Sequence, residues 1–202
     1  CIDAAMKEYA FAKYQGAGND FIIVNALHSP LPEINGQTAL TWCDRHFGIG
    51  ADGLIVLRPS SQAQCRMQLF NSDGSEASMC GNGLRCMVMF ARDEGLVAAS
   101  EYAVETPAGV LQVKLQTGPD GQPSGVTVQM GQPRLLARDV PTTLAPGDQR
   151  VVQAPLVVND QEWAVTAMNM GNPQCVVFVP NVDEIDLYCL GPAIERHPAF
   201  PQ

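Results

Sequence analysis

Positive charge is scarce in this chain of 202 residues, which carries 12 Lys and Arg against 21 Asp and Glu and a formal net charge of −9. So few basic side chains do not neutralise a row of phosphates, which argues against a nucleic acid or an anionic membrane as partner. No apolar run reaches the roughly 18 residues that a membrane helix needs, and the N-terminus lacks the pattern of a signal peptide. The sequence therefore predicts a cytoplasmic protein that binds a small molecule or another protein.

The chain also offers little to a metal ion or a disulfide scaffold. Its seven cysteines are an odd number without a C-x-x-C pair, and only His28, His46 and His197 could join them. We therefore expect no metal site, and we expect most thiols to be reduced and buried. The chain opens on Cys1 instead of Met, so residues 1–5 are interpreted as a remnant of processing or expression.

Short apolar runs bounded by turn residues dominate the pattern and predict strands. The predicted strands cover residues 21–24, 54–57, 67–70, 110–115, 126–130 and 176–179. Many strands beside few helices indicate an α+β fold. Gly, Pro and Asp cluster at residues 118–124, which predicts a boundary between a first domain, residues 1–120, and a second one, residues 121–202.

Helical periodicity is clear in one place, where Leu84, Met87, Val88 and Ala91 recur at the spacing of one helix face. Residues 89–90 are apolar too, so this helix is expected to be buried on nearly all sides. Weaker patterns predict two more helices. They cover residues 37–45 and 186–196.

The stretch MCGNGLRC, residues 79–86, places Cys80 where the buried helix is expected to begin. The first N–H groups of a helix have no intrahelical partner, so they bind an anion, and a thiol among them ionises more readily than a free one. The glycines on both sides of Asn82 let a ligand approach the backbone. The alternative is that Cys80 is a small buried apolar residue and the glycines serve only a turn. Cys86 has no polar setting and is predicted to belong to the core.

Three asparagines stand at the ends of predicted strands. Asn19 follows Gly18 before one buried run, and Asn172 follows Gly171 before another. If this weak echo reflects a duplication, each half contributes one asparagine to a shared cleft. Asn71 ends the run 67–70, where it either binds a ligand or only forms the turn that follows.

Four motifs, in this order and spacing, resemble those of the diaminopimelate epimerase family. They are residues 16–21, 70–76, 79–86 and 170–175. The resemblance runs from about Lys7 to Pro201. It implies an isomerase that interconverts LL- and meso-diaminopimelate for lysine and peptidoglycan precursors, without pyridoxal phosphate or another cofactor and without a metal.

The family resemblance also implies the architecture and the site. It implies two pseudo-symmetric domains, each a curved, mostly antiparallel sheet around a central helix, with the second domain incomplete here, and it suggests a homodimer. Cys80 would be one of two catalytic cysteines, acting as thiolate base in one direction and thiol acid in the other. The residues that would bind the substrate are Asn19, Asn71, Gly81, Asn82 and Asn172. An α-C–H is a very weak acid, so its anion needs preorganised donors in a dry site, and inversion needs an acid on the opposite face.

Three departures from the family pattern limit these expectations. The second cysteine and a Glu-Arg pair of the family lie beyond residue 202, so we expect these 202 residues alone to be inactive as an epimerase. Gln174 stands where many members carry His, and Gly53 stands where some carry Gln. Neither side-chain role is carried over. Cys175, a candidate substitute for the second cysteine, lies in an apolar strand and is predicted to be a core residue.

Three alternatives stay open on the sequence alone. The first is another cofactor-independent racemase, acting on proline or histidine. The second is a hydrolase in which His46 activates Cys80. The third is a non-catalytic binding or assembly module derived from the epimerase.

Overall fold

The computed structural model describes residues 8–28, 31 and 33–201, so residues 1–5 lie outside the part that it describes. The chain divides into two compact units, Cys1–Met130 and Gly131–Gln202, which are described separately. None of the helices in the described part has both the length and the apolar character that crossing a bilayer requires.

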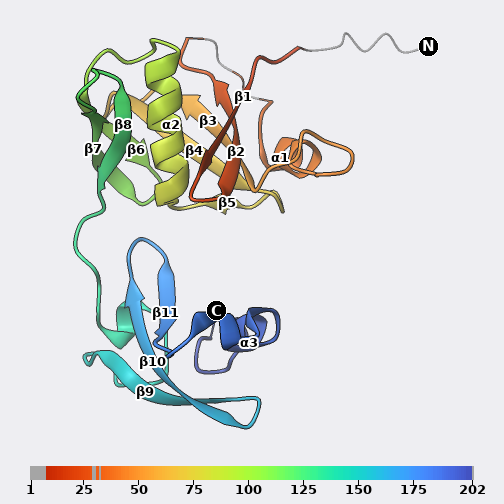
Figure 1. The fold of residues 1–202 in the computed structure, drawn as a ribbon, viewed down its shortest axis with the longest axis vertical. Coiled ribbons are helices and arrows are strands. Elements are labelled where there is room, and N and C mark those ends of the chain that lie inside the picture. The colour runs from red at the N-terminus through yellow and green to blue at the C-terminus, as the bar shows by residue number, and fades with distance from the viewer. Residues whose placement is uncertain (1–7, 29–30, 32, 202) are drawn as a thin grey trace. The chain divides into compact units, whose positions relative to one another are not determined.

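The first unit is built on one sheet (Figure 1). Its strands are β1 (Ala12–Gly16), β2 (Asn19–Asn25), β3 (Gly53–Arg58), β4 (Cys65–Asn71), β5 (Glu76–Ala77), β6 (Glu101–Thr106), β7 (Gly109–Thr117) and β8 (Pro123–Gln129). They follow the order β1-β2-β3-β4-β6-β7-β8, with β5 paired to β4. Only the pairs β2–β3 and β4–β6 are parallel among these strands. The predicted α+β class with a mostly antiparallel sheet is confirmed.

The helix α2 (Gly81–Asp93) lies within the curve of this sheet. It contacts β1 and β8, which are the two ends of the sheet, and also β2, β3, β4 and β7 between them. A helix reaches both end strands only if the sheet curls around it, as Figure 1 shows. Leu84, Met87, Val88 and Ala91 are fully or almost fully buried. The predicted buried central helix is confirmed.

The runs in β2 and β3 are continuously apolar because both faces of the sheet are covered. Phe21 and Ile23 pack in the cluster around α2, whereas Ile22 and Val24 pack in a second cluster on the opposite face. That cluster includes Ala39 of α1 (Gly36–Trp42), the second helix of this unit. The sequence predicts that this helix continues to Arg45, which is wrong, because α1 ends at Trp42.

The reason α1 stops early is a turn held by Asp44. The Asp44 carboxylate accepts hydrogen bonds from the backbone N–H groups of His46 and Phe47, both at 2.7 Å. A short polar side chain that bonds the following backbone offers an alternative to a further helical turn.

The second unit carries a smaller antiparallel sheet in the order β11-β10-β9. Its elements are the 3₁₀ helices η1 (Ala137–Asp139) and η2 (Val182–Glu184), the strands β9 (Val151–Val158), β10 (Gln161–Asn169) and β11 (Pro173–Val177), and the helix α3 (Leu187–Glu195). The helix predicted over 186–196 is confirmed. The strand predicted over 176–179 is displaced, because β11 begins at Pro173 and ends at Val177. Proline lacks an N–H group but is tolerated there because β11 is an edge strand.

Residues 118–124, predicted as a domain boundary, cover the turn from β7 to β8 and the first two residues of β8, all within one sheet. The chain passes from the first unit to the second between Met130 and Gly131. Clusters of Gly, Pro and Asp occur both in hairpin turns and in linkers between domains, so composition alone does not distinguish a turn from a domain boundary.

Candidate active site

Cys80 is the N-cap residue of α2. Its backbone is extended, with φ −148° and ψ 107°, and its sulfur accepts a hydrogen bond from the backbone N–H of Gly83 at 3.3 Å. The N–H groups of Gly81 and Asn82 have no acceptor within the described residues. The half-buried thiol therefore lies beside backbone donors at the positive end of the helix dipole.

Gly83 lets the start of α2 lie directly on the sheet. A Cβ atom at this position would stand 3.2 Å from Ile55 Cδ1, 3.4 Å from Phe21 Cζ and 3.5 Å from Cys80 Sγ. A larger residue would therefore push the helix terminus away from β2 and β3. At Gly81 the nearest atom to such a Cβ is 3.8 Å away, so this glycine is not required by packing.

Asn19 is the predicted substrate residue that the structure brings next to Cys80. The Cys80 thiol donates to Asn19 Oδ1, with 3.8 Å between the sulfur and the oxygen. Asn19 Nδ2 donates to Asp52 Oδ2 at 2.8 Å. Asn19 opens β2 and Asp52 directly precedes β3, and these neighbouring parallel strands begin at the same edge of the sheet, with Phe21 opposite Gly53.

A group of charged side chains surrounds this edge. Arg45 Nη2 donates to Asp20 Oδ1 at 2.6 Å and to Asp52 Oδ1 at 2.8 Å, and Lys13 pairs with Asp20. The Arg45 guanidinium, with Lys13, holds the pKa of Asp20 well below its usual range. The sequence analysis missed this group. Asp20 and Asp52 each stand beside the start of a predicted strand, and this pattern could have indicated the two carboxylates. The contact of Arg45 with them depends on the turn after α1, which the sequence pattern does not predict.

The other predicted substrate residues have separate settings. Asn71 ends β4 opposite Gly53, and its Nδ2 donates to Ser75 Oγ at 2.9 Å within the predicted turn. The side chain of Asn82 accepts a hydrogen bond from Arg85. Asn172 belongs to the second unit, where it is exposed between β10 and β11.

Gly53 and Gln174, the two positions that depart from the family pattern, differ in how much room they leave for a side chain. Gly53 is buried, and a Cβ there would lie 2.9 Å from the carbonyl oxygen of Phe70 and 3.1 Å from Leu69 Cδ1. No side chain fits at this position without displacing β4. Gln174 is exposed on β11 in the second unit.

The other cysteines that the structure describes in the first unit are shielded by burial. Cys86 is 4% exposed within the core around α2, which confirms its predicted core role, and burial raises the pKa of its thiol. Burial also raises the pKa of Cys43 to about 11 and that of Cys65 to about 12. Thiols with such values carry little of the reactive thiolate at neutral pH.

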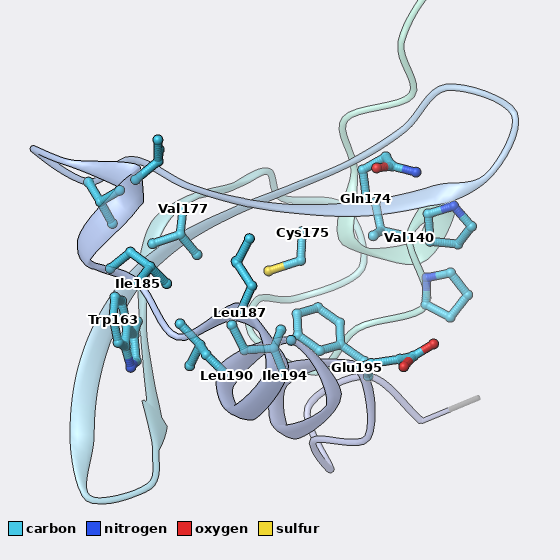
Figure 2. A pocket seen from close by; sticks show the side chains of 16 residues that line it. Val140, Trp163, Gln174, Cys175, Val177, Ile185, Leu187, Leu190, Ile194 and Glu195 are labelled. Carbon is cyan, nitrogen blue, oxygen red and sulfur yellow. The ribbon is translucent and has the colours of Figure 1, made fainter. Parts of the chain in front are cut away.

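Cys175 lies in the second unit beside a pocket of about 540 Å³ (Figure 2). Its sulfur points toward apolar side chains that include Leu187 and Ile194, while Gln174 and Glu195 supply polar groups at the rim. Burial raises the pKa of Cys175. This apolar setting agrees with a packing role for Cys175.

His46 does not join Cys80 in the arrangement of a hydrolase. Its backbone is held by Asp44 and its ring lies near Phe47, with the ring centres 6.5 Å apart. Between His46 and Cys80 the described part of the chain shows no hydrogen bond. No group of three or more His, Cys, Asp or Glu residues among those described is placed to hold a metal ion.

Solved structures with the same class of fold include a hydroxyproline epimerase and a probable proline racemase. The chain is similar to a hydroxyproline epimerase from Agrobacterium vitis, with a TM-score of 0.61 and 16% identity over 90% of this chain and 52% of the other. It is also similar to a probable proline racemase from Agrobacterium radiobacter, with a TM-score of 0.60 and 13% identity over 90% and 52% of the two chains. At these identities the similarity defines the fold.

The sequence comparisons define the family. The family model for diaminopimelate epimerase matches residues 11–136. The chain is 50% identical to the diaminopimelate epimerase of Cyanothece sp. over 95% of this chain and 68% of the relative, and 49% identical to that of Thermosynechococcus vestitus over 96% and 67%. The chain belongs to the diaminopimelate epimerase family and is an isomerase. The family and the enzyme class predicted from the four motifs are confirmed.

Proposed function

We propose that this protein interconverts LL- and meso-diaminopimelate and that Cys80 exchanges the proton at the substrate α-carbon on one face. The observation that carries this proposal is the position of the Cys80 thiol, between the Gly83 N–H donor and the Asn19 Oδ1 acceptor at the start of α2. An acid/base group must be stable in both protonation states during one catalytic cycle.

The two contacts of Cys80 match its two protonation states. As a thiol, Cys80 donates its proton to Asn19 Oδ1 and accepts from Gly83 N–H. As a thiolate, it keeps the Gly83 N–H bond and the favourable end of the helix dipole. When the thiolate removes the α-proton, the new S–H regains Asn19 as an acceptor.

The start of α2 also suits the carboxylate next to the reacting carbon. The N–H groups of Gly81 and Asn82 have no intrahelical acceptor, and helix N-termini bind carboxylates with such donors. When the α-proton is removed, negative charge spreads from the α-carbon onto the carboxylate oxygens. The same N–H donors stabilise this charge. In this proposal Asn19, Asn71, Gly81, Asn82 and Asn172 bind the substrate.

Inversion requires a second acid/base on the opposite face of the α-carbon. The family pattern assigns it to a second cysteine that is not among these 202 residues. A polypeptide of these 202 residues alone is therefore expected not to epimerise diaminopimelate. We also propose that the reaction supplies precursors of lysine and peptidoglycan and that the protein is a cytoplasmic homodimer. The two units are proposed to belong to the two epimerase domains of the family.

The test is turnover of LL-diaminopimelate in deuterated water by the full-length protein, with and without Cys80→Ser. Serine is a far weaker acid than cysteine, so we expect α-deuterium incorporation to fall by about 100-fold or more. Cys189→Ser is the matched control, because Cys189 is exposed in the second unit. Unchanged incorporation in Cys80→Ser contradicts the proposal. Turnover of proline with none of diaminopimelate would assign a different racemase.

A further inference from the structure

Asn19 is bonded on both ends of its side-chain amide, and the two partners differ in kind. Its Nδ2 faces Asp52 Oδ2 at 2.8 Å and its Oδ1 faces Cys80 Sγ at 3.8 Å. A carboxylate only accepts hydrogen bonds, so the amide nitrogen must point to Asp52. The carbonyl oxygen is then left for the thiol.

Asp52 is itself held in place by three donors, two from β2 and one from the turn after α1. Asp52 Oδ2 accepts from Asn19 Nδ2 and from the backbone N–H of Asp20 at 3.1 Å, and Asp52 Oδ1 accepts from Arg45 Nη2 at 2.8 Å. The backbone N–H of Asp52 in turn donates to the carbonyl oxygen of Asp20 at 2.9 Å. Rotation of this carboxylate would break bonds to β2 and to the turn after α1 together.

We propose that Asp52 is a positioning residue that orients the Asn19 amide with its oxygen toward the Cys80 sulfur. This inference rests on the proposed role of Cys80. Without an acceptor at residue 52, the Asn19 amide is free to turn its NH₂ group to the sulfur. An oxygen beside the sulfur favours the protonated thiol, whereas an N–H donor favours the thiolate. Asp52 thereby sets which form of Cys80 meets the substrate.

The experiment measures the rate at which iodoacetamide alkylates Cys80 at neutral pH, followed by peptide mass spectrometry. In Asp52→Ala we expect this rate to rise roughly fivefold, as the net effect of one hydrogen bond predicts. The exposed thiol of Cys189 provides an internal reference whose rate stays constant. Circular dichroism verifies that each variant is folded.

A double-mutant cycle separates orientation from charge. Asp52→Ala removes a negative charge as well as an acceptor, and the charge effect persists when Asn19 is replaced by Leu. In the Asn19→Leu background we therefore expect Asp52→Ala to change the rate by less than about twofold, because this exposed charge is screened. If Asp52→Ala does not fold, Asp52→Leu, which also lacks an acceptor, takes its place, and we expect at least a twofold rise that requires Asn19.

The same factor with and without Asn19, or no change in either background, overturns the proposal. Alkylation of Cys80 needs no turnover, so this result is independent of the deuterium experiment. Loss of activity in Cys80→Ser with no coupling between residues 19 and 52 would leave the proposed function standing and remove Asp52 from it.

Discussion

Cys80 and Cys175 are both half-buried, one in each unit, yet their surroundings differ in chemistry. Cys80 stands at a helix N-terminus with an N–H donor on one side and an amide oxygen on the other. Cys175 points from a strand toward aliphatic side chains, and burial raises the pKa of its thiol. Two half-buried thiols are therefore not equivalent, because the neighbouring donors and acceptors decide which protonation states are stable.

The first prediction sharpens this comparison by labelling all thiols of one sample with iodoacetamide at about pH 8. Burial raises the pKa of Cys65 to about 12, so only about one Cys65 thiol in 10,000 is ionised at this pH, and we expect it to react far more slowly than Cys80. Cys175 should also react more slowly than Cys80. Peptide mass spectrometry over time gives each rate, with exposed Cys189 as reference. Faster labelling of Cys175 than of Cys80 would contradict the conclusion that the surroundings of Cys80 make it the more reactive thiol.

The second prediction contrasts the helices of the two units. Leu84 of α2 is fully buried, so Leu84→Ala is expected to lower the free energy of unfolding by about 3 kcal/mol. Leu190 of α3 is only partly buried, and Leu190→Ala is expected to cost about 1 kcal/mol.

Trp42 and Trp163 lie in different units, so each unit can be followed by the fluorescence of one tryptophan. Urea unfolding is measured in Trp163→Phe for the first unit and in Trp42→Phe for the second. An equal loss of stability in the two leucine variants would show that α2 is not the better-packed helix.

The third and smallest effect concerns one glycine in each unit. Gly53→Ala is expected to cost about 1–2 kcal/mol, because its Cβ would lie 2.9 Å from the Phe70 carbonyl oxygen. Gly191→Ala, within α3, meets no atom within 4 Å outside its chain neighbours, but its Cβ would face the ring of Pro192, which opposes the gain in helix propensity. It is therefore expected to change the stability of the second unit by less than about 0.5 kcal/mol. Thermal unfolding of both variants is compared with that of the wild type, and an equal loss of stability in the two would contradict this pair.

The central helix and the strands beside it were predictable because their signals are local. The spacing of Leu84, Met87, Val88 and Ala91 follows from the helical repeat, and continuous apolar runs such as residues 21–24 follow from burial on both faces. The end of α1 and the start of β11 were not predicted correctly. The end of α1 depends on the turn that Asp44 forms with the following backbone. The start of β11 depends on its place at the edge of the sheet, where a proline is allowed.

The position of Cys80 at a helix start was legible in the sequence, but its partners were not. Asn19 is near Cys80 only because β2 lies under the first turn of α2, where Gly83 permits close approach. Asp52 and Arg45 reach Asn19 through the parallel pairing of β2 with β3 and the turn after α1.

The sequence by itself determined the family, the α+β class, the central helix and the cysteine at its start, since each depends on motifs or periodicities within a short stretch. The tertiary structure alone decided which atoms face the Cys80 sulfur. Hydrogen bonds depend on distances between strands and turns that are remote in the sequence, and an amide beside a carboxylate can satisfy it in only one orientation.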